Sequence, residues 1–158
     1  MIVADANLIV YLFRDTPFTA AARAVYAKDG DWVVPDLWQA EVLNVLLREV
    51  RAGFLTIQNA LQTADYATEL LEKQVRKCDH RLVMRIGEKS GLTAYDACYV
   101  ALARSLNIRL VTEDRKIQQS CPDVACSMKA FLAQTDSPGM LREKQQTYRV
   151  RRNRHDRP

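Results

Sequence analysis

The stretch VADANLIV, residues 3–10, decides the fold class and raises the question of function. It continues an apolar run that begins at Ile2, which is typical of a short buried strand, and the run ends at Asp5. From about Asn7 to Phe13 the sequence predicts a helix. Burying an unpaired carboxylate is costly, so an acid at the end of a buried strand needs a compensating partner. A bound divalent cation is a natural candidate.

The rest of the chain alternates short apolar stretches with helical patterns, which is typical of an α/β fold. Strands are expected at residues 2–4, 32–34, 109–112 and 124–126, and helices at about 7–13, 16–28, 36–51, 56–75, 79–89, 93–107 and 114–119. The long segment from 36 to 91 shows no strand signal. These elements predict a three-layer fold in which a small parallel sheet is flanked by helices. Ligands of such folds bind at the carboxyl ends of the strands.

The helix expected at 36–51 carries two stripes of side chains. Four apolar residues repeat at helical spacing and are expected to face the core, namely Leu43, Leu46, Leu47 and Val50. Glu41, Asn44 and Arg48 are spaced three and four apart and form a polar stripe. We expect this polar stripe to face the functional site.

Three other segments place an acid where a strand or helix would deliver it to the same edge of the sheet. They are LWQAEVLNVL at 37–46, LTAYDACYVALA at 92–103 and LVTEDRKI at 110–117. The four acids are therefore Asp5, Glu41, Asp96 and Asp114. Hard divalent cations take oxygen ligands, and Mg²⁺ keeps several waters, so a few carboxylates can hold it. Such an ion can activate water, so the four acids predict a divalent-metal site.

Each acid also has a structural interpretation. Thr93 and Asp96 have the spacing of a helix-capping pair, and Asp114 suits the N-cap of the short helix that follows it. Glu41 suits a salt bridge to Arg48 or to another element. An acid that ends a buried strand has the fewest structural uses. Capping and metal binding are compatible, so both interpretations stay open.

Other catalytic arrangements find little support in the sequence. Neither a Ser–His–Asp arrangement nor a glycine-rich phosphate loop is recognisable among the residues. Tyr95 and Tyr99 lie four apart on one expected helix, where packing is the default interpretation.

In order and spacing these segments resemble the PIN domain, a family of metal-dependent ribonucleases. More narrowly, the chain resembles the toxin of a VapBC toxin–antitoxin pair. The matching features are Asp-Ala-Asn at 5–7, Pro35 leading to Glu41 and Asn44, the segment 93–103, and Val-Thr-Glu-Asp-Arg at 111–115. The resemblance covers roughly residues 1–132.

This resemblance implies a metal-dependent endoribonuclease that is the toxin of a type II toxin–antitoxin pair. Such an enzyme cleaves structured RNA, tRNA or rRNA, by water attack on a phosphodiester. The resemblance further implies Mg²⁺ or Mn²⁺ as cofactor, a cognate antitoxin that inserts a segment near the acids, and a homodimer.

We assign catalytic and metal-binding roles to the four acids on this basis. Asp5 and Asp96 are the principal metal ligands. Glu41 ligates the ion or orients the activated water, and Asp114 completes the cluster directly or through water. Two polar residues are candidates for contacts with these ligands or with a phosphate, namely Asn7 and Thr112.

Two other functions compete with this hypothesis. The first is a non-catalytic PIN-like scaffold that binds RNA or protein, against which the intact set of four acids argues. The second is a phospho-accepting receiver domain, which also places an acid after an early strand. The residues before Asp5 are apolar, and no strand is expected between 36 and 91, which both argue against a receiver.

The charge of the chain is concentrated near its end. The net charge is +4, and residues 137–158 contain seven basic and two acidic residues, a net +5. We therefore expect a PIN-like nuclease domain at 1–134 and a basic, disordered tail at 135–158. The basic tail would attract the RNA backbone more strongly than the nearly neutral nuclease domain does.

The sequence also predicts a cytoplasmic protein without a membrane segment. The first residues lack a basic stretch, and no apolar run approaches the roughly 20 residues of a membrane helix. Four cysteines and two histidines lack the spacing of a zinc site, which favours reduced thiols.

Overall fold

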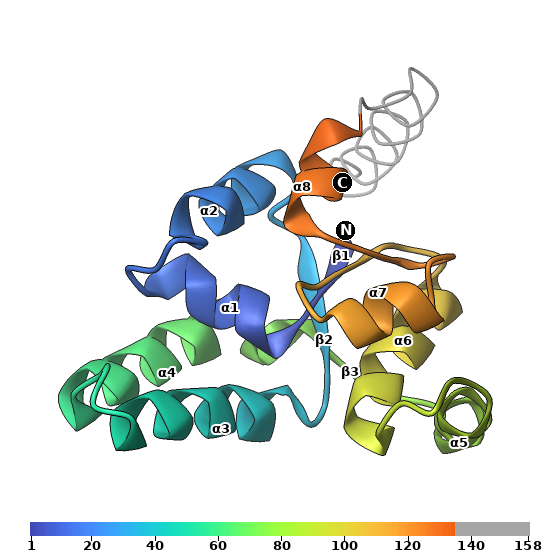
Figure 1. Cartoon of the computed structure of the whole chain (residues 1–158), viewed down its shortest axis with the longest axis horizontal. Coiled ribbons are helices and arrows are strands. Elements are labelled where there is room, and N and C mark those ends of the chain that lie inside the picture. The colour runs from blue at the N-terminus through green and yellow to red at the C-terminus, as the bar shows by residue number, and fades with distance from the viewer. Residues whose placement is uncertain (135–158) are drawn as a thin grey trace, which may run out of the picture.

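A computed structural model describes residues 1–134, and the tail expected at 135–158 lies outside the described residues (Figure 1). Five parallel strands form one sheet in the order β3-β2-β1-β4-β5. The strands are β1 (Ile2–Ala4), β2 (Trp32–Pro35), β3 (Val75–Arg76), β4 (Leu110–Val111) and β5 (Ala125–Cys126). The helices are α1 (Ala6–Phe13), α2 (Thr19–Lys28), α3 (Trp38–Arg51), α4 (Ile57–Leu71), α5 (His80–Ser90), α6 (Ala94–Leu106), α7 (Arg115–Ser120) and α8 (Met128–Ala133), with a 3₁₀ turn η1 (Glu72–Gln74). The predicted α/β class, with a small parallel sheet flanked by helices, is confirmed.

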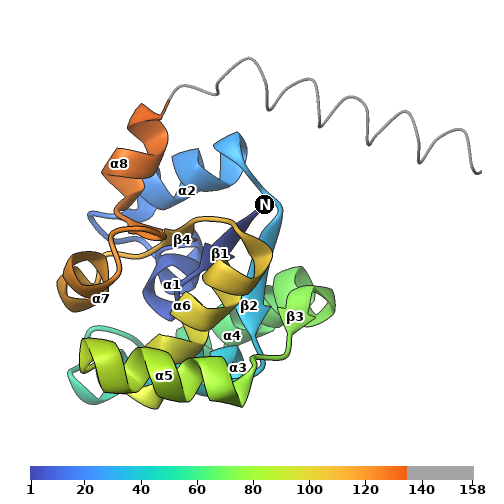
Figure 2. The same ribbon diagram turned by 90° about the vertical axis from the view of Figure 1, so that its right-hand side faces the viewer.

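The central strands are buried on both faces, as parallel sheets require. Successive residues of a strand point to opposite faces, so Ile2 and Ala4 join one core while Val3 joins the other. The first core packs α1, α2, α3, α4 and α8 on one face of the sheet. The second packs α5, α6 and α7 on the other face, and Figure 2 shows α5 beside α6. None of the helices within residues 1–134 is both long and apolar enough to cross a membrane.

The segment from 36 to 91 contains a strand that the sequence did not predict. Helix α4 ends at Leu71 rather than near 75, and after η1 the two residues of β3 pair with Val34 and Pro35 of β2. The expectation of an uninterrupted helical segment was therefore wrong. A two-residue edge strand that follows a helix through one 3₁₀ turn is too short to show an alternating pattern.

The core face of α3 also differs from the prediction. Leu46 is buried, but Leu43 and Leu47 are 46% and 40% exposed, and the buried stripe is Trp38, Val42, Val45 and Leu46. Both stripes have helical spacing, so periodicity could not choose between them. The large Trp38 side chain at the start of the helix belongs to the stripe that faces the core.

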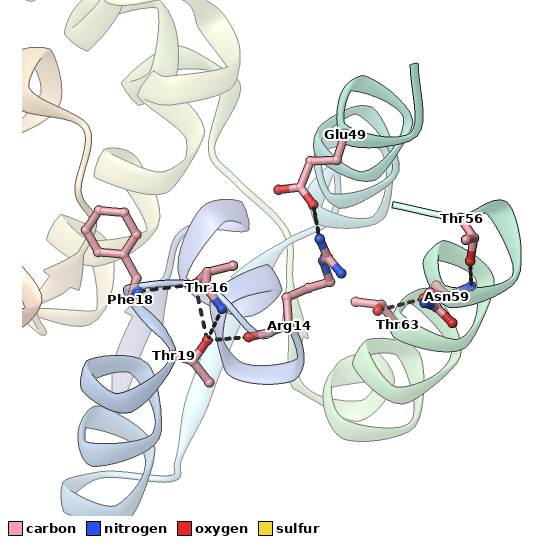
Figure 3. A network of polar contacts seen from close by, with 8 residues as sticks. All are labelled: Arg14, Thr16, Phe18, Thr19, Glu49, Thr56, Asn59 and Thr63. Carbon is pink, nitrogen blue, oxygen red and sulfur yellow. Dashed lines mark hydrogen bonds and ion pairs between the residues drawn. The ribbon is translucent and has the colours of Figure 1, made fainter. Parts of the chain in front are cut away.

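Helix α2 begins at Thr19, later than the start expected at about residue 16, so Pro17 precedes the helix. The Thr19 hydroxyl accepts a hydrogen bond from the backbone N–H of Thr16 at 2.8 Å and donates to the carbonyl of Arg14 (Figure 3). The Arg14 guanidinium in turn pairs with Glu49 of α3 at 2.9 Å. This network fixes the turn between α1 and α2 and delays the start of the helix.

Helix α8 was not expected from the sequence. Ser127 caps its first turn, and the Lys28 ammonium donates to the carbonyls of Phe131 and Leu132 at 3.0 and 3.3 Å. The last turn of α8 is thereby attached to the end of α2.

Candidate active site at the carboxyl edge of the sheet

Asp5 lies where β1 ends, at the N-cap position of α1, and only 6% of its surface is exposed. The hydroxyl of Thr112 donates to Asp5 Oδ2 at 2.7 Å. Burial raises the pKa of Asp5 above its ordinary value. Hydrogen bonds from Thr112, the Ala6 backbone and Asn7 oppose that rise in pKa, whereas the charge of Asp114 adds to it.

Thr112 lies at the end of β4 and is fully buried. Its backbone N–H donates to the carbonyl of Cys126 at 3.0 Å, while its hydroxyl oxygen accepts the N–H of Asp114 at 3.0 Å. Since the same hydroxyl donates to Asp5, Thr112 links the first and fourth acids. The Thr112 hydroxyl thus contacts the Asp5 carboxylate and the Asp114 backbone.

Asp114 and Asp96 both make the capping contacts that their positions allow. Asp114 Oδ1 accepts the N–H groups of Lys116 and Ile117 at 2.7 and 3.0 Å. The Thr93 hydroxyl accepts the N–H of Asp96 at 3.2 Å and donates to Asp96 Oδ2 at 2.7 Å. The structural interpretation is confirmed for both acids, and capping holds their carboxylates in place.

Glu41 lies half-buried in the first turn of α3. Burial raises its pKa, and the negative charges of Asp5 and Asp96 raise it further. The salt bridge to Arg48 does not form. The ion pairs within residues 1–134 join Met1 to Asp29, Arg14 to Glu49 and Arg104 to Asp123. In that part of the chain none of the four acids has a basic partner.

The four acids therefore form an electrostatic cluster at the carboxyl edge of the sheet. Asp5 feels the charge of Asp114, and Glu41 feels the charges of Asp5 and Asp96. Across residues 1–134, no three acidic, histidine or cysteine side chains lie close enough together to hold an ion as they stand. Mg²⁺ is often held by only one or two carboxylates, with waters and substrate phosphates completing its shell. The carboxylate oxygens and the lack of a basic partner in the described chain fit such an ion.

Sequence reasoning missed the hydroxyl of Tyr99. The ring packs in the core as expected, with 1% of the residue exposed, but its hydroxyl is buried without a hydrogen-bond partner in the described structure. Tyr95, for which packing was also expected, is 61% exposed. The signal available in the sequence was the position of Tyr99, three residues after Asp96 and on the same face of α6.

A mainly apolar pocket lies apart from the four acids. It is a cavity of about 520 Å³ lined by Leu12, Phe13, Tyr26, Tyr66, Glu69 and Leu70. None of the four clustered acids lines it, so it is not the place to expect metal chemistry.

Comparison with known proteins places the chain in a family. The family model for the PIN domain matches residues 2–121. Ribonuclease VapC3 of Pyrobaculum aerophilum is 28% identical over 125 residues, which cover 77% of this chain and 95% of that protein. Ribonuclease VapC1 of Mycobacterium tuberculosis is 26% identical over 127 residues, covering 80% and 95% respectively.

Solved structures show the same fold. PAE2754 from Pyrobaculum aerophilum superimposes with a TM-score of 0.66 at 23% identity, covering 83% of this chain and 85% of that chain. FitAcB from Neisseria gonorrhoeae gives a TM-score of 0.63 at 15% identity, covering 82% and 99%. A structure of FitAB bound to an IR36 DNA fragment gives 0.64 at 14% identity, covering 87% and 100%.

Proposed function

The chain belongs to the PIN-domain family, and we propose that it is a Mg²⁺- or Mn²⁺-dependent endoribonuclease, the toxin of a type II toxin–antitoxin pair. Its substrate would be structured RNA, tRNA or rRNA, cleaved by water attack on a phosphodiester. The observation that carries the proposal is the pair Asp5 and Glu41. Both carboxyls have raised pKa values, and neither has a basic partner in the described chain. The names of the two ribonuclease relatives support the reaction.

The four acids would have different roles in the proposed reaction. A bound divalent cation lowers the pKa of a water ligand and offsets the charge of the phosphate. Asp5 and Asp96 would hold the ion, the first supported by Thr112 and the second by Thr93. Glu41 would also ligate the ion, or orient the attacking water and accept its proton. Asp114 would contribute through the carboxylate that caps α7.

The proposed partners are an antitoxin and a second copy of the chain. The resemblance to the toxin of a VapBC pair, together with the relatives named as VapC ribonucleases, supports an antitoxin. A small gene that encodes a DNA-binding protein beside the gene for this chain would support the proposed antitoxin partner. We place the activity in the cytoplasm, in keeping with four free cysteines.

The basic segment 137–158 would supply the attraction for RNA that an acidic site lacks. Its net charge is +5, while residues 1–136 carry −1. A chain ending at Gln134 should fold with an unchanged melting temperature but bind RNA more weakly, with a shallower dependence of log K on log salt. An unchanged salt slope would assign the segment to a protein partner, and failure to fold would refute the domain boundary.

The test of the proposed function is cleavage of RNA by Asp5→Asn and Asp96→Asn with Mg²⁺ or Mn²⁺. Neither variant should cleave RNA, and EDTA should abolish cleavage by the wild type. Mg²⁺ should raise the melting temperature of the wild type and not that of Asp5→Asn, because only an ion that binds the folded state stabilises it. A folded wild type that binds RNA but never cleaves it would favour the alternative of a non-catalytic scaffold.

A further inference from the structure

Among the side-chain nitrogen and oxygen atoms buried within residues 1–134, the Tyr99 hydroxyl is the one without a hydrogen-bond partner. Such groups are rare because the lost hydrogen bond to water is not replaced, and each calls for an explanation such as an ordered water or ion. A neutral phenol offers one donor and one acceptor. The missing partner is therefore a water or an acceptor group.

The direction of α6 indicates that this hydroxyl lies on the side of the acidic cluster. Helix α6 leads into the parallel strand β4, so its first turn lies at the carboxyl edge of the sheet, and it packs against β1 and β2. Side chains on a helix lean toward its N-terminus, and Tyr99 shares a face with Asp96. After burial, the charges of Asp5 and Glu41 are the largest causes of the raised pKa of Tyr99.

Glu41 is the member of the cluster that lacks a hydrogen-bond donor. Asp5 accepts from Thr112, Asp96 from Thr93, and Asp114 from two backbone N–H groups. Within residues 1–134, no hydrogen bond to the carboxylate of Glu41 is formed. A buried donor and a half-buried acceptor, each without a partner there, thus lie at one edge of the sheet.

We propose that Tyr99 and Glu41 together hold an ordered water at the acidic edge of the sheet. The phenolic O–H donates to the water oxygen, and the water donates to the Glu41 carboxylate. Tyr99 is then a positioning residue, because it sets the orientation of Glu41 through the water. The inference rests on the proposed function for its catalytic consequence, whereas the water itself does not depend on catalysis.

The test combines a crystal structure of the wild type with Mn²⁺ titrations of variants by calorimetry. We expect a water within hydrogen-bond distance of both Tyr99 Oη and Glu41 in the crystal. Tyr99→Phe should weaken Mn²⁺ binding about 10-fold, the lower end for an outer contact of a metal ligand. The matched control is Tyr95→Phe, which deletes the same atom from an exposed side chain of the same helix and should bind Mn²⁺ as the wild type does.

A double-mutant cycle then separates positioning from packing. If Tyr99 acts through Glu41, Tyr99→Phe should have no further effect on Mn²⁺ affinity in a Glu41→Gln background. Equal effects in both backgrounds, or a crystal structure without the bridging water, would overturn the inference. Failure of the proposed function would look different, because the wild type would then bind no Mn²⁺ or Asp5→Asn would still cleave RNA.

Discussion

Carboxylates at the two edges of the sheet lie in opposite electrostatic environments. At the amino edge Asp123 accepts two hydrogen bonds from Arg104, both at 2.9 Å, and Asp29 pairs with the N-terminus. The Arg104 hydrogen bond lowers the pKa of Asp123. At the carboxyl edge Asp5 and Glu41 have raised pKa values and no basic partner in the described chain.

This difference separates acids with a basic partner, which serve the fold, from acids without one, which under the proposed function are kept for a metal ion. A carboxylate paired with arginine stabilises the folded state at neutral pH. A buried carboxylate beside other carboxylates destabilises it, because burial and like charge both disfavour ionisation. Within residues 1–134 the fold bears that cost at the carboxyl edge, where the ends of β1 and β4 and the first turns of α3 and α6 carry the four acids. Perturbed carboxyl pKa values of this kind are typical of functional sites.

The largest expected effect is on catalysis. Asp5→Asn should lower RNA cleavage by more than ~100-fold, since a metal ligand is worth several kcal/mol of transition-state stabilisation. Asp123→Asn should leave cleavage within ~2-fold of wild type. Single-turnover cleavage of a labelled RNA measures both. Similar losses of cleavage activity in the two variants would show that the acids of the two edges do not differ in function.

The next effect concerns the donor that holds Asp5. Thr112→Val should destabilise the protein by ~1.5–3 kcal/mol, the usual worth of a hydrogen bond to a charged group, because it removes the 2.7 Å bond to the carboxylate. Thr112→Ser keeps the hydroxyl and loses a methyl group, so it should cost only ~0.8 kcal/mol. Urea unfolding at pH 7 measures the two. If serine proves as costly as valine, packing rather than the hydrogen bond is what matters at this position.

The third expected effect is a gain in stability rather than a loss. Asp5→Asn should raise the melting temperature of the metal-free protein at pH 7 by ~2–4 °C for each kcal/mol of repulsion and burial cost removed. Because the folded pKa of Asp5 is raised above 3.8, its protonated form favours folding. Wild type and variant should therefore converge as the pH falls through the folded pKa toward 3.8. A variant less stable than wild type at pH 7 would show that ionised Asp5 supports the fold.

Local chemistry explains what could be predicted from the sequence. Asp114 and Thr93 were recognisable as caps because capping depends on neighbours within one turn, and both caps form. The buried strands were recognisable because a parallel sheet covered on both faces leaves runs of apolar residues. The order of acids along the chain indicated their common edge for the same topological reason.

Long-range packing explains what could not be predicted. Strand β3 exists because its two residues meet β2, and no pattern within them shows this. The core face of α3 depends on where Trp38 fits, which spacing does not encode. The lone hydroxyl of Tyr99 is visible only once α6 is placed against β1 and β2.

The smallest expected effect completes the comparison at the amino edge. Asp123→Asn should lower the free energy of unfolding at pH 7 by ~0.2–1 kcal/mol, since both partners are partly exposed and solvent screens the pair. The folded pKa of Asp123 is lowered, so its stabilising contribution is present above 3.8 and disappears as the pH falls through the folded value. The Asp123→Asn difference should thus be lost only below 3.8, whereas the Asp5→Asn difference, which has the opposite sign, decreases as the pH falls from the folded pKa to 3.8. Urea unfolding of the three proteins between pH 7 and pH 3 measures both curves. Two curves of the same sign would mean that the acids of the two edges are not under different electrostatic control.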